Sequence, residues 1–115
     1  MENTTINIVN TIGDVYGVEA EDGQKVFELI IKAFTDKKKV ILSFQNIEML
    51  TTAFLNTAIG QLYKDYQEEY IKVNLKVSDV SESGKVALKR VVDTAKLYYK
   101  DPEALKRSID EISED

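Results

Sequence analysis

The sequence contains no cysteine and no histidine, and each absence removes a class of chemistry. Without cysteine there is no disulfide framework, no thiol nucleophile and no thiolate metal site. Without histidine, imidazole acid-base chemistry and most zinc sites are excluded as well. Only carboxylate, lysine, tyrosine and hydroxyl groups remain for catalysis. We therefore expect that the protein is not an enzyme, and we predict neither a cofactor nor a metal site.

Long apolar runs and a basic face are also missing. No segment approaches the roughly 20 apolar residues that span a bilayer, and residues 1–17 lack the basic flank and apolar core of a signal peptide. The net charge is −5, and residues 101–115 hold six of the acids against two bases. This charge argues against nucleic acid as a partner. The sequence predicts a soluble, cytoplasmic protein without a membrane partner.

The residues that are present suffice for one folded domain. A chain of 115 residues that is 43% hydrophobic can bury a core without disulfides or metal. We place this domain at residues 1–100. Asp101-Pro102-Glu103 is a helix-start signal, and Leu105, Ile109 and Ile112 follow at helical spacing. Residues 101–115 are therefore predicted to form an acidic C-terminal helix or tail.

The N-terminal residues predict a β-hairpin followed by a helix. Apolar and polar residues alternate through Thr4–Val9, a second apolar group lies at Val15–Val18, and Gly13-Asp14 between them is a turn signal. From Asp22 onward, apolar residues recur at helical spacing, and a run of lysines at Lys37–Lys39 suits the end of a helix.

The middle of the chain predicts a buried strand and an amphipathic helix. Val40–Phe44 is apolar except for Ser43, a pattern typical of a central strand that is covered on both faces. From Thr52 to Tyr66, apolar residues fall on one stripe of a helix. The predicted helix therefore begins with a hydroxyl residue, which is a common N-cap.

The last part of the domain predicts an edge strand and another helix. Ile71–Val77 alternates apolar and polar residues. Ser81 or Ser83 can cap the helix that follows and ends near Tyr99. With the earlier elements, this order predicts an α/β fold: a mixed four-stranded sheet with packed helices and an extra C-terminal helix.

The segment Lys39–Tyr66 resembles the central part of STAS domains, and most of all the uncharacterised STAS-like branch. Val40–Leu42 stand where the family has its buried aliphatic run, and Ile47 matches the apolar position after the turn. Thr51–Leu55 lie over the family's Asp-Ser-Ser/Ala-Gly-Leu signature. The resemblance extends more weakly to about Tyr99 and implies the STAS-like fold.

Within this signature, Thr52 occupies the place of the regulatory phosphoserine, and Thr51 is the neighbouring candidate phosphosite. Ser43 and Thr51 stand where the family has Asp, and Phe54 stands where it has Gly. A second explanation of Thr51 and Thr52 is that one of them simply caps the helix. Phosphorylation at a helix N-terminus would add negative charge that the fold tolerates.

The resemblance implies a small regulatory protein that acts by protein-protein interaction, as anti-sigma-factor antagonists do. Its partner would be an ATP-binding kinase or an anti-sigma-like protein in a partner-switching system. The partner would dock on the turn before Thr52 and along its helix. The predicted partner-binding residues are Gln45, Asn46, Glu48, Thr51, Thr52 and Asn56.

Two alternatives remain open at this stage. The chain could instead be an accessory or inhibitor subunit of a mobile-element or defence system, without phosphoregulation. A polar loop at Asp79–Lys85 ends in Ser-Gly-Lys, like a phosphate-binding loop, but it lacks that motif's first Gly and its final Ser or Thr. A capped helix start explains this loop better.

Overall fold

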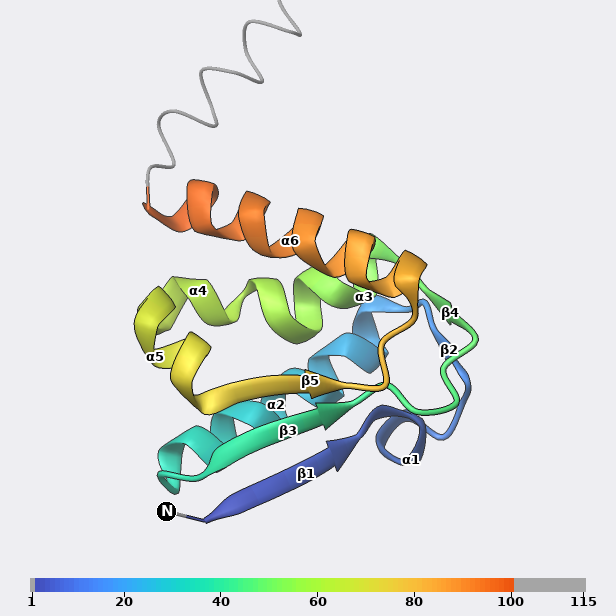
Figure 1. Ribbon diagram of the computed structural model, residues 1–115, viewed down its shortest axis with the longest axis horizontal. Helices are drawn as coiled ribbons and strands as arrows, with labels where there is room; N and C mark the ends of the chain where they lie inside the picture. The colour runs from blue at the N-terminus through green and yellow to red at the C-terminus, as the bar shows by residue number, and fades with distance from the viewer. Residues whose placement is uncertain (1, 101–115) are drawn as a thin grey trace, which may run out of the picture.

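A computed structural model describes residues 2–100, and the predicted acidic helix or tail at residues 101–115 lies outside the described residues. The described helices and strands follow one another along the chain as β1 (Asn3–Asn7), α1 (Ile8–Ile12), β2 (Tyr16–Gly17), α2 (Ala20–Thr35), β3 (Lys39–Ser43), β4 (Met49–Leu50), α3 (Thr52–Leu55), the π-helical segment η1 (Asn56–Gly60), α4 (Leu62–Asp65), α5 (Glu68–Asn74), β5 (Leu75–Ser78) and α6 (Glu82–Lys100). Figure 1 shows this arrangement.

The main sheet has three parallel strands in the order β1-β3-β5 (Figure 1). Leu42 of β3 lies between Ile6 of β1 and Val77 of β5 in the register. The prediction that Val40–Phe44 forms the central strand is therefore confirmed. The predicted mixed four-stranded sheet is wrong. Its strand number differs because β2 and β4 form a separate parallel pair. Its strand direction differs because the connections between the main strands contain helices, which favours parallel pairing.

The predicted N-terminal hairpin is also wrong, because a short helix interrupts it. The side chain of Asn7 accepts a hydrogen bond from the N–H of Asn10 at 2.9 Å and so caps α1. Gly13, at a φ of 72°, ends that helix by donating its N–H to the carbonyl oxygen of Val9 at 2.8 Å. This left-handed conformation suits glycine. The chain therefore leaves the sheet after β1 instead of turning back beside it.

Helices cover only one face of the main sheet within residues 2–100. Val40 and Leu42 of β3 point to the covered face and pack in the core with Ile30 of α2. On the opposite face, Thr5 and Lys76 are exposed and Ile41 between them is half-buried. In Figure 1, α2 passes behind the strands and no helix lies across their near face. The expected cover on both faces is therefore wrong.

The helix predicted from Thr52 begins at that residue and continues as α3, η1 and α4. It lies between α2 and α6 (Figure 1), and Phe54, Leu55 and Leu62 are fully buried along it. The predicted first helix starts slightly earlier than Asp22, with Glu19 at its N-cap position. These helices form the layer that supports the surface described below.

The strand predicted at Ile71–Val77 is mostly a helix. Its first four residues belong to α5, where the side chain of Asn74 donates a hydrogen bond to the carbonyl oxygen of Tyr70 at 2.9 Å. Ile71 is buried in the core, and only the residues from Leu75 onward form β5, an edge strand as predicted. Within residues 2–100, no helix combines the length and apolarity that are needed to cross a membrane.

Candidate functional site

The turn between β3 and β4 carries three of the predicted partner-binding residues. The N–H of Ile47 donates to the carbonyl oxygen of Phe44 at 3.1 Å, and Asn46 adopts a left-handed conformation at a φ of 66°. This tight turn leaves the side chains of Gln45, Asn46 and Glu48 exposed. Their role in binding a partner stays a prediction.

An exposed apolar pair lies directly beside this turn. Tyr16 of β2 and Met49 of β4 are register partners in a parallel ladder, so both side chains lie on the same face of it. They are 48% and 54% exposed, respectively. Hydrogen bonds hold the two segments together, from the N–H of Glu48 to Val15 O at 2.8 Å and from the N–H of Thr51 to Gly17 O at 3.0 Å.

Sequence reasoning missed this pair. Tyr16 lies in the predicted second strand of the hairpin, but its register partner Met49 is 33 positions away in a two-residue strand, which is too short to show a strand pattern. We refer to these two residues together with the exposed residues around them as the turn face. It consists of Tyr16, Gln45, Asn46, Glu48, Met49 and Thr52.

The two candidate phosphosites have different environments. The hydroxyl of Thr51 donates a hydrogen bond to Val18 O at 2.7 Å and accepts one from the N–H of Phe54 at 3.2 Å. Thr51 is half-buried and is the N-cap of α3. A phosphate on Thr51 would replace the hydroxyl hydrogen and so break the bond to Val18 O.

Thr52 follows as the first residue of α3, and it is exposed. Within the described part of the chain, no hydrogen bond engages its hydroxyl. Asn56, the last of the predicted partner-binding residues, is also exposed and lies four positions later, on the same side of the helix. Thr51 therefore has a structural role, whereas the hydroxyl of Thr52 is accessible.

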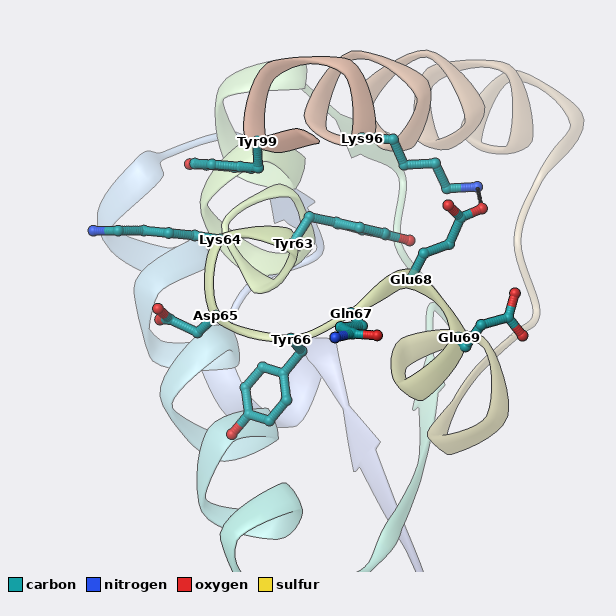
Figure 2. Close-up of a pocket in the computed structure, with 9 residues that line it drawn as sticks. All are labelled: Tyr63, Lys64, Asp65, Tyr66, Gln67, Glu68, Glu69, Lys96 and Tyr99. Carbon is teal, nitrogen blue, oxygen red and sulfur yellow. Dashed lines mark ion pairs between the residues drawn. The ribbon is translucent and has the colours of Figure 1, made fainter. Parts of the chain in front are cut away.

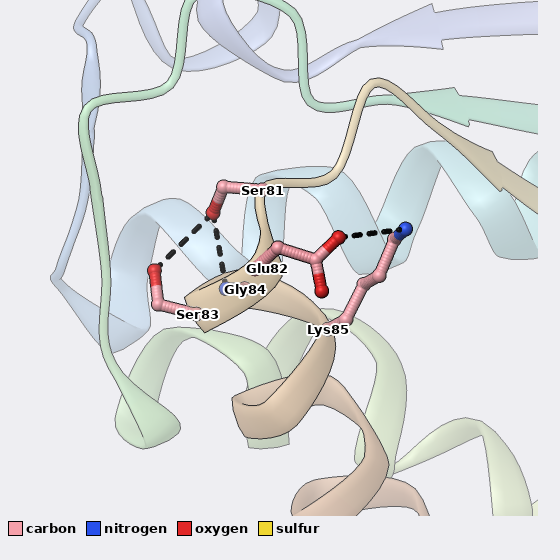
Figure 3. Close-up of polar contacts among 5 residues, drawn as sticks. All are labelled: Ser81, Glu82, Ser83, Gly84 and Lys85. Carbon is pink, nitrogen blue, oxygen red and sulfur yellow. Dashed lines mark hydrogen bonds and ion pairs between the residues drawn. The ribbon is translucent and has the colours of Figure 1, made fainter.

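The polar loop before α6 is a helix cap, as the sequence suggests. The hydroxyl of Ser81 accepts a hydrogen bond from the N–H of Gly84 at 3.0 Å and lies 3.3 Å from the hydroxyl of Ser83. Lys85 pairs with Glu82 at 3.5 Å and points away from the two serines (Figure 3). The hollow between this loop and β4 has a volume of only about 100 Å³. Small-molecule pockets are usually several times larger.

A larger pocket of about 530 Å³ lies between the C-terminal half of α6 and the turn from α4 to α5 (Figure 2). Lys96 of α6 forms an ion pair with Glu68 of α5 at 2.9 Å, and this pair raises the pKa of the Lys96 ammonium. Burial raises the pKa of the Tyr63 phenol beside it. Both shifts favour the proton-bound forms, so these groups are better suited to donating hydrogen bonds than to removing protons.

The described residues do not form a metal-binding cluster of three or more carboxylates. The turn face is different from the pocket in Figure 2, since it is an exposed surface that combines apolar and polar side chains. Such a combination is typical of protein-protein contacts.

Comparison with known proteins gives a match to a family model. A family model described as "STAS-like domain of unknown function (DUF4325)" matches residues 22–85, which run from α2 to the first turn of α6. The matched range contains β3, the turn after it, Thr51 and Thr52. No curated protein and no solved structure matches the chain.

Proposed function

Because the chain belongs to the family of STAS-like domains of unknown function, we propose that it is a small regulatory protein that binds another protein through the turn face. The observation that carries this proposal is the exposed pair Tyr16 and Met49 beside the exposed turn. Large apolar side chains next to polar ones, with an ordered backbone beneath them, can form the centre and rim of an interface.

The charge around the turn face suggests the chemistry of the partner. Glu48 belongs to the turn face, and the exposed carboxylates of Asp14 and Asp79 lie beside its two segments. Asp14 accepts a hydrogen bond from the N–H of Tyr16 at 3.2 Å, and Asp79 lies 3.4 Å from the hydroxyl of Ser43 at the start of the turn. We expect the partner to present an apolar centre with arginine or lysine at its edge.

Thr52 provides a way to regulate this contact. Its hydroxyl is accessible at the start of α3, whereas the hydroxyl of Thr51 is engaged in structure. Phosphorylation of Thr52 would add roughly two negative charges to an already acidic surface, next to a helix N-terminus that tolerates them. We propose an ATP-binding kinase or anti-sigma-like protein as the partner, whose binding the phosphate would weaken.

The test uses the full chain as bait in an extract of its host and then measures binding of the purified partner. Tyr16→Ala/Met49→Ala should weaken binding by about tenfold or more, or at least ~1.4 kcal/mol, because central apolar contacts dominate interfaces. The control Leu29→Ala removes a leucine on α2 that is 41% exposed, and it should bind like wild type. Equal affinity of the double variant and wild type would refute the proposal.

Thr52 variants separate regulation from simple binding. Thr52→Glu should weaken binding while Thr52→Ala preserves it, and phosphate should be present on Thr52 in protein from the host. If wild type, Thr52→Ala and Thr52→Glu bind equally, the chain binds without phosphoregulation. That result would favour the accessory or inhibitor subunit.

A further inference from the structure

A groove of about 510 Å³ separates α6 from β5, on the side of β5 that faces away from β3. In Figure 1, β5 points toward the start of α6, and α6 runs back in the opposite direction. Apolar side chains line the groove from both elements and from the helices behind it: Ile59, Tyr63, Ile71, Leu75, Val77, Leu88 and Val92. Val77 remains 40% exposed there.

The strand beside the groove has an open edge. Among the described residues, β5 pairs only with β3, so alternate backbone N–H and C=O groups of β5 face the groove without a strand partner. Open edges of this kind invite pairing with other chains, and proteins usually cover them with a helix, a loop or charged side chains. The groove beside this edge is therefore a candidate docking site for a covering segment.

The charged side chains along the groove are mostly basic. Lys72, Lys76 and Lys96 line it together with a single acid, Glu68, which pairs with Lys96 at 2.9 Å. Within residues 2–100, no carboxylate lies at ion-pair distance from Lys72 or Lys76. An acidic, amphipathic segment would match this lining.

Residues 101–115 have this composition. They hold six acids and two bases, and this leaves 14 acids and 13 bases in residues 1–100. Most of the net negative charge of the protein is thus in this segment, −4 of −5, together with Leu105, Ile109 and Ile112 at helical spacing. The sequence provides both an apolar stripe for the floor of the groove and carboxylates for its lysines.

The length of the segment and its point of attachment also fit. It begins after Lys100, at the end of α6 and about one turn beyond Lys96. Pro102 cannot continue a helix hydrogen-bonding pattern and disfavours helical geometry at the residue before it, so it favours a change of direction at this point. As a helix, residues 103–115 would span about 20 Å, and the distance along α6 from Lys100 back to Leu88 is about 18 Å.

We propose that residues 101–115 fold back along α6 and occupy the groove beside β5 as an intramolecular cover. The apolar stripe of the segment packs on Leu75, Val77 and Val92, and its carboxylates face Lys72 and Lys76. This contact covers the open edge of β5 against other chains. It lies apart from the turn face and does not depend on the function proposed above.

The absence of cysteine makes a direct test possible. Ser113→Cys introduces a single thiol, which is labelled with a nitroxide in the full-length, ¹⁵N-labelled protein. Paramagnetic broadening should be strong at the amides of Leu75–Val77 and weak at those of α1, which follows β1 at the opposite edge of the sheet (Figure 1). Equal broadening at both places would overturn the proposal.

A charge reversal and its control test the cause. The variant Lys72→Glu/Lys76→Glu should reduce the broadening at Leu75–Val77 to the level seen at α1. The control Lys25→Glu/Lys32→Glu changes two exposed lysines of α2 and should retain the broadening at Leu75–Val77. Added salt should reduce it in the unsubstituted labelled protein by screening the same charges. Retained broadening in the groove variant and in salt would overturn the electrostatic match.

The same label distinguishes one chain from two. In a mixture of nitroxide-labelled ¹⁴N protein and unlabelled ¹⁵N protein, an intramolecular contact gives no broadening. Broadening in the groove of the ¹⁵N chains would assign the groove to the tail of a second copy, and would overturn the intramolecular proposal.

Discussion

The hydroxyl of Thr51 donates a hydrogen bond to the carbonyl oxygen of Val18 at 2.7 Å and so connects the start of α3 to the segment that precedes α2. The hydroxyl oxygen of Thr51 also accepts a hydrogen bond from the N–H of Phe54 at 3.2 Å. One side chain therefore both caps a helix and fixes its position against a segment 33 residues earlier. Thr52, the next residue, is exposed.

Thr51→Ala should lower the free energy of unfolding by about 1–2 kcal/mol, because it removes the cap and leaves the Phe54 N–H without its acceptor. Thr52→Ala should change the free energy of unfolding by no more than about 0.5 kcal/mol, as is usual for exposed positions. Thr51→Ser keeps the hydroxyl and serves as the control. Urea denaturation measures all three, and an equal loss for Thr51→Ala and Thr52→Ala would contradict the assignment.

The sequence indicated that a hydroxyl residue starts this helix, but it could not decide between two adjacent threonines. Either residue fits the cap pattern. The decision depends on tertiary structure, because the acceptor at Val18 is contributed by a distant segment. The resemblance to the STAS family gave Thr52 as the phosphosite by position in a motif, and the structure adds only that its hydroxyl is accessible.

The one-sided cover of the sheet predicts unequal effects at neighbouring positions of β3. Leu42 is fully buried, so Leu42→Ala should cost about 2–5 kcal/mol. Ile41 points to the other face and is half-buried, so Ile41→Ala should cost clearly less, about 1 kcal/mol. Leu42→Asp should prevent cooperative folding by burying an unpaired charge. Thermal and urea unfolding would show this, and similar costs for Leu42→Ala and Ile41→Ala would indicate cover on both faces.

The apolar run Val40–Phe44 identified the central strand correctly but did not determine how many of its faces are covered. Ile41 makes the run continuous, although its flanking positions on the open face are Thr5 and Lys76. Those neighbours belong to strands 36 and 35 positions away, so the polar character of that face emerges only from the register. The sequence of a single strand reveals its apolar run but not the residues of the neighbouring strands that flank it.

Gly23 marks a close approach between α2 and α3. A Cβ atom at this position would lie 2.5 Å from the backbone oxygen of Phe54, which cannot move without shifting the helix. Gly23→Ala should therefore destabilise the protein by about 1–3 kcal/mol, despite the better helix propensity of alanine. At Gly60, the nearest atom would be 3.4 Å away, so Gly60→Ala should be neutral or stabilising by up to about 1 kcal/mol. Chemical denaturation compares the two variants, and a stable Gly23→Ala protein would refute this close packing.

Two local patterns misled the sequence interpretation for physical reasons. Ile6 and Ile8 alternate with polar residues as in a strand, yet Asn7 between them ends β1 by capping α1. Ile71, Val73 and Leu75 alternate as well, but the buried position of Ile71 and the hydrogen bond from Asn74 to Tyr70 O stabilise a helix through Asn74. Short alternating segments carry too few residues to outweigh a cap or a core contact.

Alkaline pH should weaken the contact between α6 and the α4–α5 region. Burial raises the pKa of Tyr63 from its usual 10.0, and the hydrogen bond with Glu68 raises that of Lys96 from 10.5. The folded protein therefore holds both protons more tightly than the unfolded chain does. The resulting stability is fully present below about pH 10 and is lost as the pH rises through the raised values.

Tyr63→Phe should consequently reduce the loss of stability between about pH 8 and about pH 11, because the variant has no phenol proton to release at this position. Glu68→Gln should also reduce it, since it removes the main cause of the Lys96 shift. Tyr16→Phe, at an exposed site on the turn face, is the matched control and should lose as much stability as wild type. Urea denaturation at both pH values gives the difference for each protein. Equal losses in wild type and Tyr63→Phe would show that Tyr63 does not contribute to the alkaline destabilisation.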